Sequence, residues 1–146
     1  DFASITIEKA MMNSEVGFCK RVLEVFDNNG ISIEHMPSGI DTMTILVHQD
    51  EFEEKEQEVV AGIHRAVEPD FVEMESDLAL IAVVGRGMKS TRGTSGRIFS
   101  ALAHANVNVR MIDQGSSELN IIIGVRNHDF DNAIKAIYDI FVMTQL

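Results

Sequence analysis

One loop of this 146-residue chain combines groups that suit the binding of a small charged molecule. Asn13, Ser14 and Gly17 precede a predicted helix, whose first N–H groups have no partner within the helix and attract carboxylates. Glu34, on the strand predicted after that helix, can pair with an ammonium group. Such a site would complement a zwitterionic amino acid. An ordinary cap at Ser14 and a solvent-facing Glu34 explain the same pattern, so the residues alone leave both interpretations open.

A second loop, Gly85 to Gly93 (GRGMKSTRG), is similar at first sight to a phosphate-binding loop. A P-loop requires Gly, Lys and Ser or Thr in direct succession, whereas here Met88 separates Gly87 from Lys89. A dinucleotide-binding fingerprint would need glycine in place of Ser90. The sequence therefore does not predict a nucleotide site.

The remaining reactive side chains form no catalytic or metal-binding pattern. The five histidines are scattered without the spacing of metal ligands. Cys19 lies in the first turn of the predicted helix, but no histidine is placed to activate it, which favours a buried packing or pocket-lining role. The first loop also lacks the arginine that an acylphosphatase would need. We expect no catalytic residues, no metal and no cofactor.

Charge and composition restrict the partners. The formal net charge of -11 disfavours nucleic acid and anionic membranes, which would repel the chain. No apolar run approaches the ~20 residues of a spanning helix, and no signal-peptide layout is present. A single cysteine excludes an intrachain disulfide and fits a reducing, cytoplasmic location. Because the chain begins at Asp1 without an initiator Met, we expect a fragment of a longer protein.

The first half reads as β-α-β-β-α-β. The first helix is predicted to begin after Asn13 and Ser14, which would cap it, and to end at Gly30. Its apolar residues repeat with helical spacing: Phe18, Val22, Val25 and Phe26. The other predicted elements are strands over 3–8, 31–35, 43–47 and 70–75 and a helix over 50–67. This order predicts a ferredoxin-like α+β domain with both helices on one face of an antiparallel sheet.

The second half repeats the first after a shift of 76 positions. Gly17 and Gly39, at the helix entrance and the hairpin turn, fall on Gly93 and Gly115. The repeat predicts strands over 78–84, 107–112 and 119–125 and helices over 95–105 and 130–141. Residues 142–146 are too short for a fourth strand. We therefore predict two ferredoxin-like domains, 1–76 and 77–146, the second lacking one strand.

Three segments carry a resemblance to a known family: the loop MMNSEVGF (11–18), the hairpin GISIEHMPSG (30–39) and the stretch NVRMIDQGSSELNI (108–121). They resemble the tandem ACT domains at the C-terminus of bacterial aspartate kinases. The resemblance implies a regulatory region that binds end-product amino acids of the lysine, threonine and methionine pathway. It implies feedback control of a separate N-terminal kinase domain, which is absent from these residues, so this chain alone would not be an enzyme.

The resemblance also implies where the effector would bind. By position, the effector-binding residues of the first half are Met12, Asn13, Ser14, Gly17, Phe18, Cys19, Ile33 and Glu34. A second-half interface or effector site would use Met88, Ser90, Gly93, Thr94 and Gln114. Lysine is the favoured effector and threonine the next, because a second ammonium group gains from Glu34 and from the acidic chain.

Two functions remain open at this point. The first is an amino-acid sensor that acts within a homodimer, with effector pockets at the seam between the chains. The second is a non-catalytic ACT-type dimerisation module that binds no ligand. An unpaired sheet edge in the second half favours a dimer in both cases.

Overall fold

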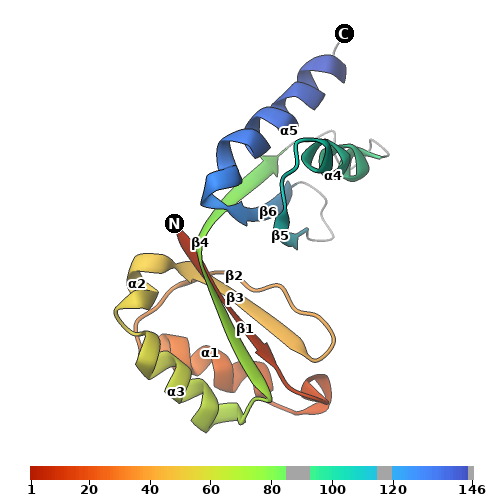
Figure 1. Cartoon of the computed structure of the whole chain (residues 1–146). Helices are drawn as coiled ribbons and strands as arrows, with labels where there is room; N and C mark the ends of the chain where they lie inside the picture. The colour runs from red at the N-terminus through yellow and green to blue at the C-terminus, as the bar shows by residue number, and fades with distance from the viewer. Residues whose placement is uncertain (85–92, 115–119, 145–146) are drawn as a thin grey trace. The chain divides into compact units, whose positions relative to one another are not determined.

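The computed structural model describes residues 1–84, 93–114 and 120–144, and the chain divides into two compact units, Asp1–Asp77 and Leu78–Leu146 (Figure 1). The boundary predicted from the repeat lies one residue earlier, between residues 76 and 77. Both units share the order strand, helix, two strands and helix.

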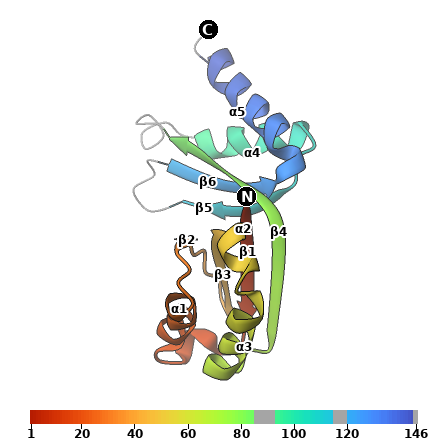
Figure 2. The ribbon, with the colours of Figure 1, turned by 90° about the vertical axis from the view of Figure 1, so that its left-hand side faces the viewer.

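The first unit has the strand order β2-β3-β1-β4, in which β1 and β2 both pair with β3 in antiparallel fashion. Its elements are β1 (Phe2–Glu8), η1 (Met12–Ser14), α1 (Phe18–Asn28), β2 (Ile33–His35), β3 (Thr42–His48), α2 (Gln49–Glu53), α3 (Glu56–Val67) and the first part of β4 (Phe71–Val84). Helices α1 and α3 lie side by side on one face of the sheet (Figure 2). The predicted ferredoxin-like order is confirmed.

The core of the first unit lies between that sheet face and the helices. Alternate residues of β1, namely Ala3, Ile5 and Ile7, are buried and pair with Val47, Ile45 and Met43 of β3. The apolar residues predicted for the first helix, Phe18, Val22, Val25 and Phe26, are all buried. Full burial of such a side chain contributes about 1.5–3 kcal/mol. This core holds β1, β3 and α1 together.

The helix predicted over 50–67 is interrupted. It consists of α2 and α3, because Phe52 is buried and the N–H of Lys55 turns back to donate to the Phe52 carbonyl at 2.9 Å. Lys55 then leaves the helical conformation at φ -122°. Periodicity alone did not reveal this break, since the apolar stripe continues across it.

The strands predicted over 70–75 and 78–84 are a single strand, β4. Asp77 takes a left-handed conformation with φ 58° within this strand. The side-chain amide of Gln49 accepts a hydrogen bond from the Asp77 N–H at 2.8 Å and donates one to the Asp77 carboxylate at 3.1 Å. These two bonds hold the unusual residue in place.

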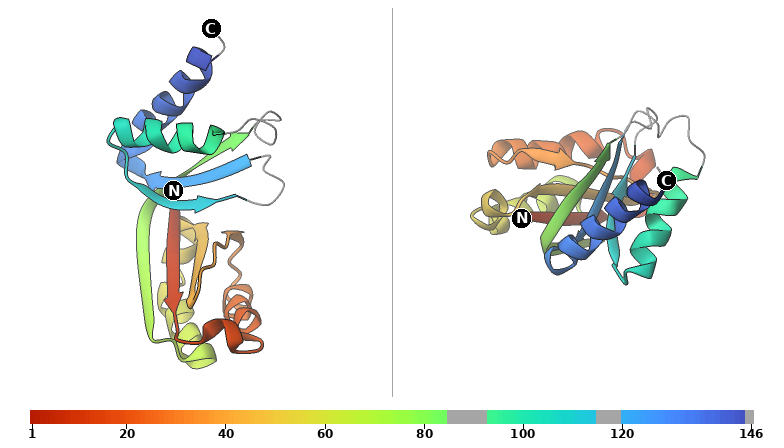
Figure 3. Two further views of the ribbon diagram at one scale, coloured as in Figure 1. Left: turned by 90° about the vertical axis from the view of Figure 1, so that its right-hand side faces the viewer. Right: turned by 90° about the horizontal axis from the view of Figure 1, so that it is seen from above.

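The second unit has the strand order β4-β6-β5, with both pairs antiparallel. Its further elements are α4 (Thr94–His104), β5 (Val109–Asp113), β6 (Asn120–Arg126), η3 (Asn127–Asp129) and α5 (Phe130–Thr144). Helices α4 and α5 cover one face of its sheet (Figure 3), where Ile98, Leu102 and Ile137 pack against Ile121 and Ile123.

A fourth strand is absent from the described residues of the second unit, as predicted. The last helix continues to Thr144, past the predicted end at Phe141.

Candidate effector site

The loop between β1 and α1 is a short, well-bonded segment. After β1 it turns through η1; Met11, directly before η1, has φ 64°, and Gly17, directly before α1, has φ 81°. Left-handed backbone is rare for a residue with a side chain and often marks a functional segment, so Met11 is notable. The N–H groups of Met12, Ser14 and Glu15 each donate to a carbonyl three residues earlier at 3.1 Å. The loop is therefore defined by its own backbone.

Gly17 caps the first helix, and the predicted cap at Asn13 and Ser14 is wrong. The Ser14 hydroxyl donates to the Met11 carbonyl at 2.9 Å, within η1. The helix begins later, at Phe18, because Gly17 alone in this stretch adopts a left-handed conformation without steric cost. Side-chain periodicity did not reveal this, since Phe18 fits either start.

The start of α1 offers two N–H groups. Phe18 donates to the Glu15 carbonyl at 3.3 Å and Arg21 to the Gly17 carbonyl at 3.0 Å. In the part of the chain that the structure describes, the N–H groups of Cys19 and Lys20 have no acceptor. Together with the helix dipole, they form a position that attracts a carboxylate.

The predicted site residues separate into a buried and an exposed set. Met12 and Phe18 are buried in the core, and Ile33 packs against it. These three side chains therefore support the loop and the strand from the side of the core. The exposed set comprises Asn13, Ser14, Gly17, Cys19 and Glu34. Because Cys19 is exposed, a buried packing role is wrong for it, and the pocket-lining role stays a prediction.

Glu34 has a partner in its own unit. Its carboxylate lies 2.8 Å from Nε2 of His48 on β3, and the His48 ring lies against Phe2 with centroids 4.9 Å apart. Val47 packs beneath the helices, so its neighbour His48 points to the other face of the sheet. No hydrogen bond or ion pair joins Glu34 to the β1–α1 loop among the described residues.

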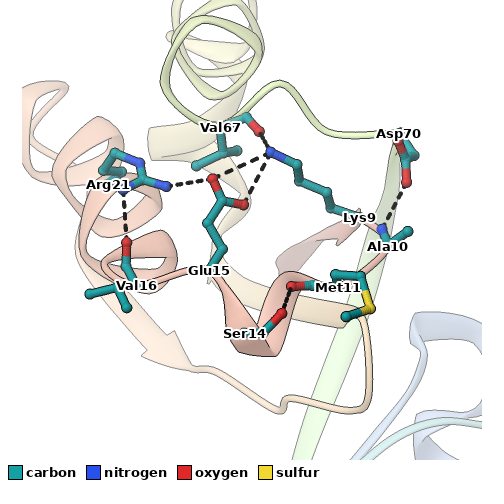
Figure 4. A network of polar contacts seen from close by, with 9 residues as sticks. All are labelled: Lys9, Ala10, Met11, Ser14, Glu15, Val16, Arg21, Val67 and Asp70. Carbon is teal, nitrogen blue, oxygen red and sulfur yellow. Dashed lines mark hydrogen bonds and ion pairs between the residues drawn. The ribbon is translucent and has the colours of Figure 1, made fainter.

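A cluster of charged residues around the loop was missed at the level of sequence (Figure 4). The Glu15 carboxylate pairs with Nζ of Lys9 at 3.1 Å and with Nη2 of Arg21 at 2.8 Å. Lys9 also donates to the Val67 carbonyl, and Arg21 to the Val16 carbonyl at 3.1 Å. We call Lys9, Glu15 and Arg21 the loop cluster. Its members are spaced six residues apart, which is not the i, i+3 or i, i+4 spacing of neighbours on a helix, and they lie on different elements, so no local pattern signals it.

The second unit reproduces the helix entrance. Gly93, with φ 79°, precedes α4; Thr94 is buried and Gln114 is exposed beside β5. Met88 and Ser90 lie outside the described residues. An open groove of about 560 Å³ between α4 and α5 is lined by none of the predicted site residues.

Two further findings concern metal ligands and membrane-spanning helices. The described residues contain no group of three or more His, Cys, Asp or Glu side chains that is arranged to hold a metal ion. None of the described helices has both the length and the apolar content needed to cross a membrane.

Comparison with known proteins gives the family. Residues 81–141 match the ACT domain family. Over 141 residues, the chain is 42% identical to Aspartokinase 3 of Bacillus subtilis, covering 96% of this chain and 31% of that protein. The chain contains an ACT domain and is similar to aspartate kinases. It therefore spans about a third of the length of this relative.

Solved structures share the fold over nearly the whole chain. The aspartate kinase of Clostridium acetobutylicum, described as an allosteric enzyme, superposes with a TM-score of 0.93 at 45% identity, over 97% of this chain and 33% of that one. The regulatory subunit of aspartate kinase from Thermus thermophilus shares the fold, with a TM-score of 0.79 at 22% identity, over 95% of this chain and 90% of that one. Aspartokinase III of E. coli, solved in complex with lysine and aspartate, shares the fold with a TM-score of 0.73 at 19% identity. The match covers 94% of this chain and 30% of that one.

Proposed function

We propose that this chain is the feedback-regulatory region of an aspartate kinase and that its first unit binds an amino-acid effector. The observation that carries the proposal is the β1–α1 loop, where two unpaired N–H groups at the start of α1 meet an ordered, exposed loop. The likeness to aspartate kinases over almost the whole chain supports the same role.

Lysine is the effector that we favour, with threonine next. Its carboxylate would accept hydrogen bonds from Cys19 and Lys20, and an ammonium group would pair with Glu34. The structure adds a condition, because Glu34 is already bonded to His48 and the ammonium group must replace the imidazole. The structure of the E. coli enzyme with lysine supports this choice.

The parent protein would be an ATP-dependent phosphotransferase that acts on the carboxylate of L-aspartate, located in the cytoplasm. Its N-terminal kinase domain would receive the signal from this region. We expect the purified chain alone to turn over no ATP. Formation of ADP that depends on aspartate would contradict this assignment.

A homodimer is the assembly that we propose, with the effector pockets at the seam. Three large apolar side chains at one end of the first unit are exposed: Val16 by 93%, Ile40 by 85% and Met11 by 71%. The Lys9 N–H donates to the Asp41 carbonyl at 3.1 Å, which places the Ile40 turn beside the loop. Exposed apolar side chains next to a binding loop favour coverage by a second chain.

The same exposed residues favour the alternative, an ACT dimerisation module without a ligand. A thermal-shift screen of the chain against the proteinogenic amino acids separates the two functions. A ligand at 100 times its dissociation constant stabilises the folded state by about 2.7 kcal/mol, which moves the unfolding midpoint measurably. A shift with lysine supports the sensor. No shift with any amino acid, in a chain that is a dimer by light scattering, supports the module.

A further inference from the structure

The loop cluster joins segments that are far apart in the sequence. Glu15 sits at its centre, and its side chain is about one third exposed, at 34%. Lys9 comes from the end of β1, Arg21 from α1, and the carbonyl of Val67 from the end of α3. These contacts hold the loop against the end of β1, α1 and the end of α3 (Figure 4).

Two hydrogen bonds also join the loop region to the beginning of β4. The N–H of Ala10 donates to the Asp70 carboxylate at 2.8 Å, and the N–H of Asp70 donates to the Glu8 carbonyl at 2.9 Å. The loop therefore has little freedom on the side of Lys9 and Ala10. On the side of α1, Arg21 holds the Val16 carbonyl directly before Gly17.

The second unit forms the same helix entrance from different residues. Gly93 and Gly17 have nearly equal φ, 79° and 81°, and both accept a 3.0 Å hydrogen bond from an arginine N–H four residues later. After the shift of 76 positions, Gly85 and Thr91 stand where the first half has Lys9 and Glu15. The Lys–Glu pair is thus not a requirement of the fold, since the same entrance forms where these two residues differ. It belongs to the unit that carries the proposed effector loop.

We infer that Glu15 is a positioning residue for the effector. By holding Lys9 and Arg21 together, its carboxylate presets the loop so that the N–H groups of Cys19 and Lys20 face an incoming carboxylate. If the loop were disordered in the free chain, it would have to become ordered on binding. The free-energy cost of that ordering would reduce the affinity for the effector. This inference rests on the proposed function for its ligand, but the ordering of the loop can be measured without one.

The test compares Glu15→Gln with a matched control in the whole chain. The control is Glu24→Gln, which removes the carboxylate of an exposed pair with Lys20 at 3.7 Å on α1. Hydrogen exchange of the ligand-free chain, followed by mass spectrometry, measures the ordering of residues 11–21. Calorimetric titration with L-lysine measures the affinity, at a temperature where every variant is folded by circular dichroism.

We expect Glu15→Gln to speed exchange in residues 11–21 alone and to weaken lysine binding about tenfold, the scale of one hydrogen bond to a charged group. Glu24→Gln should change neither quantity. Arg21→Lys keeps the charge but loses the fork that holds both Glu15 and the Val16 carbonyl, so it should fall between the two. A merely structural role would lower the unfolding midpoint and leave the affinity of the folded chain unchanged.

The outcomes separate the two proposals. Unchanged exchange in Glu15→Gln overturns the inference whatever the ligand result, and so does unchanged lysine affinity in a parent chain that binds lysine. If the parent chain binds neither lysine nor threonine, the proposed function fails. Faster exchange in Glu15→Gln would then still support Glu15 as the residue that orders the loop.

Discussion

Replacing Gly17 by alanine probes the helix entrance of the first unit, and Gly93→Ala is its control. Both glycines have a positive φ, 81° and 79°. A Cβ at Gly17 would lie 3.2 Å from Nη1 of Arg21, whereas a Cβ at Gly93 meets no described atom within 4 Å. The pair therefore shares the backbone penalty and differs in the contact with the loop cluster.

The expected magnitudes follow from these contacts. A side chain in left-handed backbone costs roughly 1–2 kcal/mol, which is the full effect expected for Gly93→Ala. In Gly17→Ala, Arg21 must also move, and its hydrogen bond to the Val16 carbonyl at 3.1 Å weakens. An intramolecular hydrogen bond contributes about 0.5–1.5 kcal/mol net. Because the Arg21 side chain is 38% exposed, we take the lower part of this range, for a total of roughly 1.5–3 kcal/mol.

Urea unfolding of the whole chain, followed by circular dichroism, measures the free energies, with separate transitions fitted if the two units unfold independently. Lysine titration of the same variants then measures the affinity. Gly17→Ala should weaken binding and Gly93→Ala should not. If Gly17→Ala costs no more than Gly93→Ala and binds lysine like the parent chain, the assignment of a tight, functional entrance at Gly17 is refuted.

Three further outcomes follow from the packing. Gly62→Ala should destabilise the chain by about 1–3 kcal/mol, because its Cβ would lie 2.8 Å from Cγ1 of Val25 in the α1–α3 interface. Gly96→Ala should instead stabilise the chain by up to about 1 kcal/mol, because this helical glycine has an ordinary φ and a Cβ there meets no described atom within 4 Å. Urea unfolding in which both variants change the free energy of unfolding in the same direction would contradict the packing described for these two glycines. Val16→Ser, which replaces a side chain that is 93% exposed, should weaken the dimer in light scattering and leave the unfolding free energy unchanged. A dimer of unchanged affinity would exclude Val16 from the seam.

The regular elements were largely predictable because their side chains report burial directly. Phe18, Val22 and Phe26 repeat with the period of a helix that lies on a sheet, and they are buried. Gly30, predicted to end that helix, has φ 70°. The internal repeat then extended the prediction to the second unit, and the few residues left after its last helix predicted that it would lack a fourth strand.

The failures arose where one residue took an unexpected backbone conformation. Asp77 is not a glycine, yet it has a φ of 58° within β4, which continues where the sequence predicted two strands. The helix cap was assigned to Ser14 from its side chain, although Gly17 caps the helix through its backbone. Residue types alone do not distinguish these cases, since the deciding hydrogen bonds come from Gln49 and from the loop itself.

The site was predictable as a location but not as a set of contacts. Glu34 was correctly described as a strand residue, but its pairing with His48 depends on the irregular register between β2 and β3. The loop cluster depends on Val67 and Asp70, which are distant in sequence from Lys9 and Ala10. Such contacts follow from the tertiary fold and leave no local pattern.

Calorimetric titration with L-lysine, on the parent chain and on Glu34→Gln, tests the central claim most directly. Glutamine keeps the shape of the side chain and removes the charge that would pair with the ammonium group. A hydrogen bond to a charged group is worth about 1.5–3 kcal/mol, so Glu34→Gln should bind lysine about tenfold or more weakly than the parent. Equal affinity in the two chains, or a parent that binds threonine and not lysine, would contradict the account of the first unit as a lysine sensor.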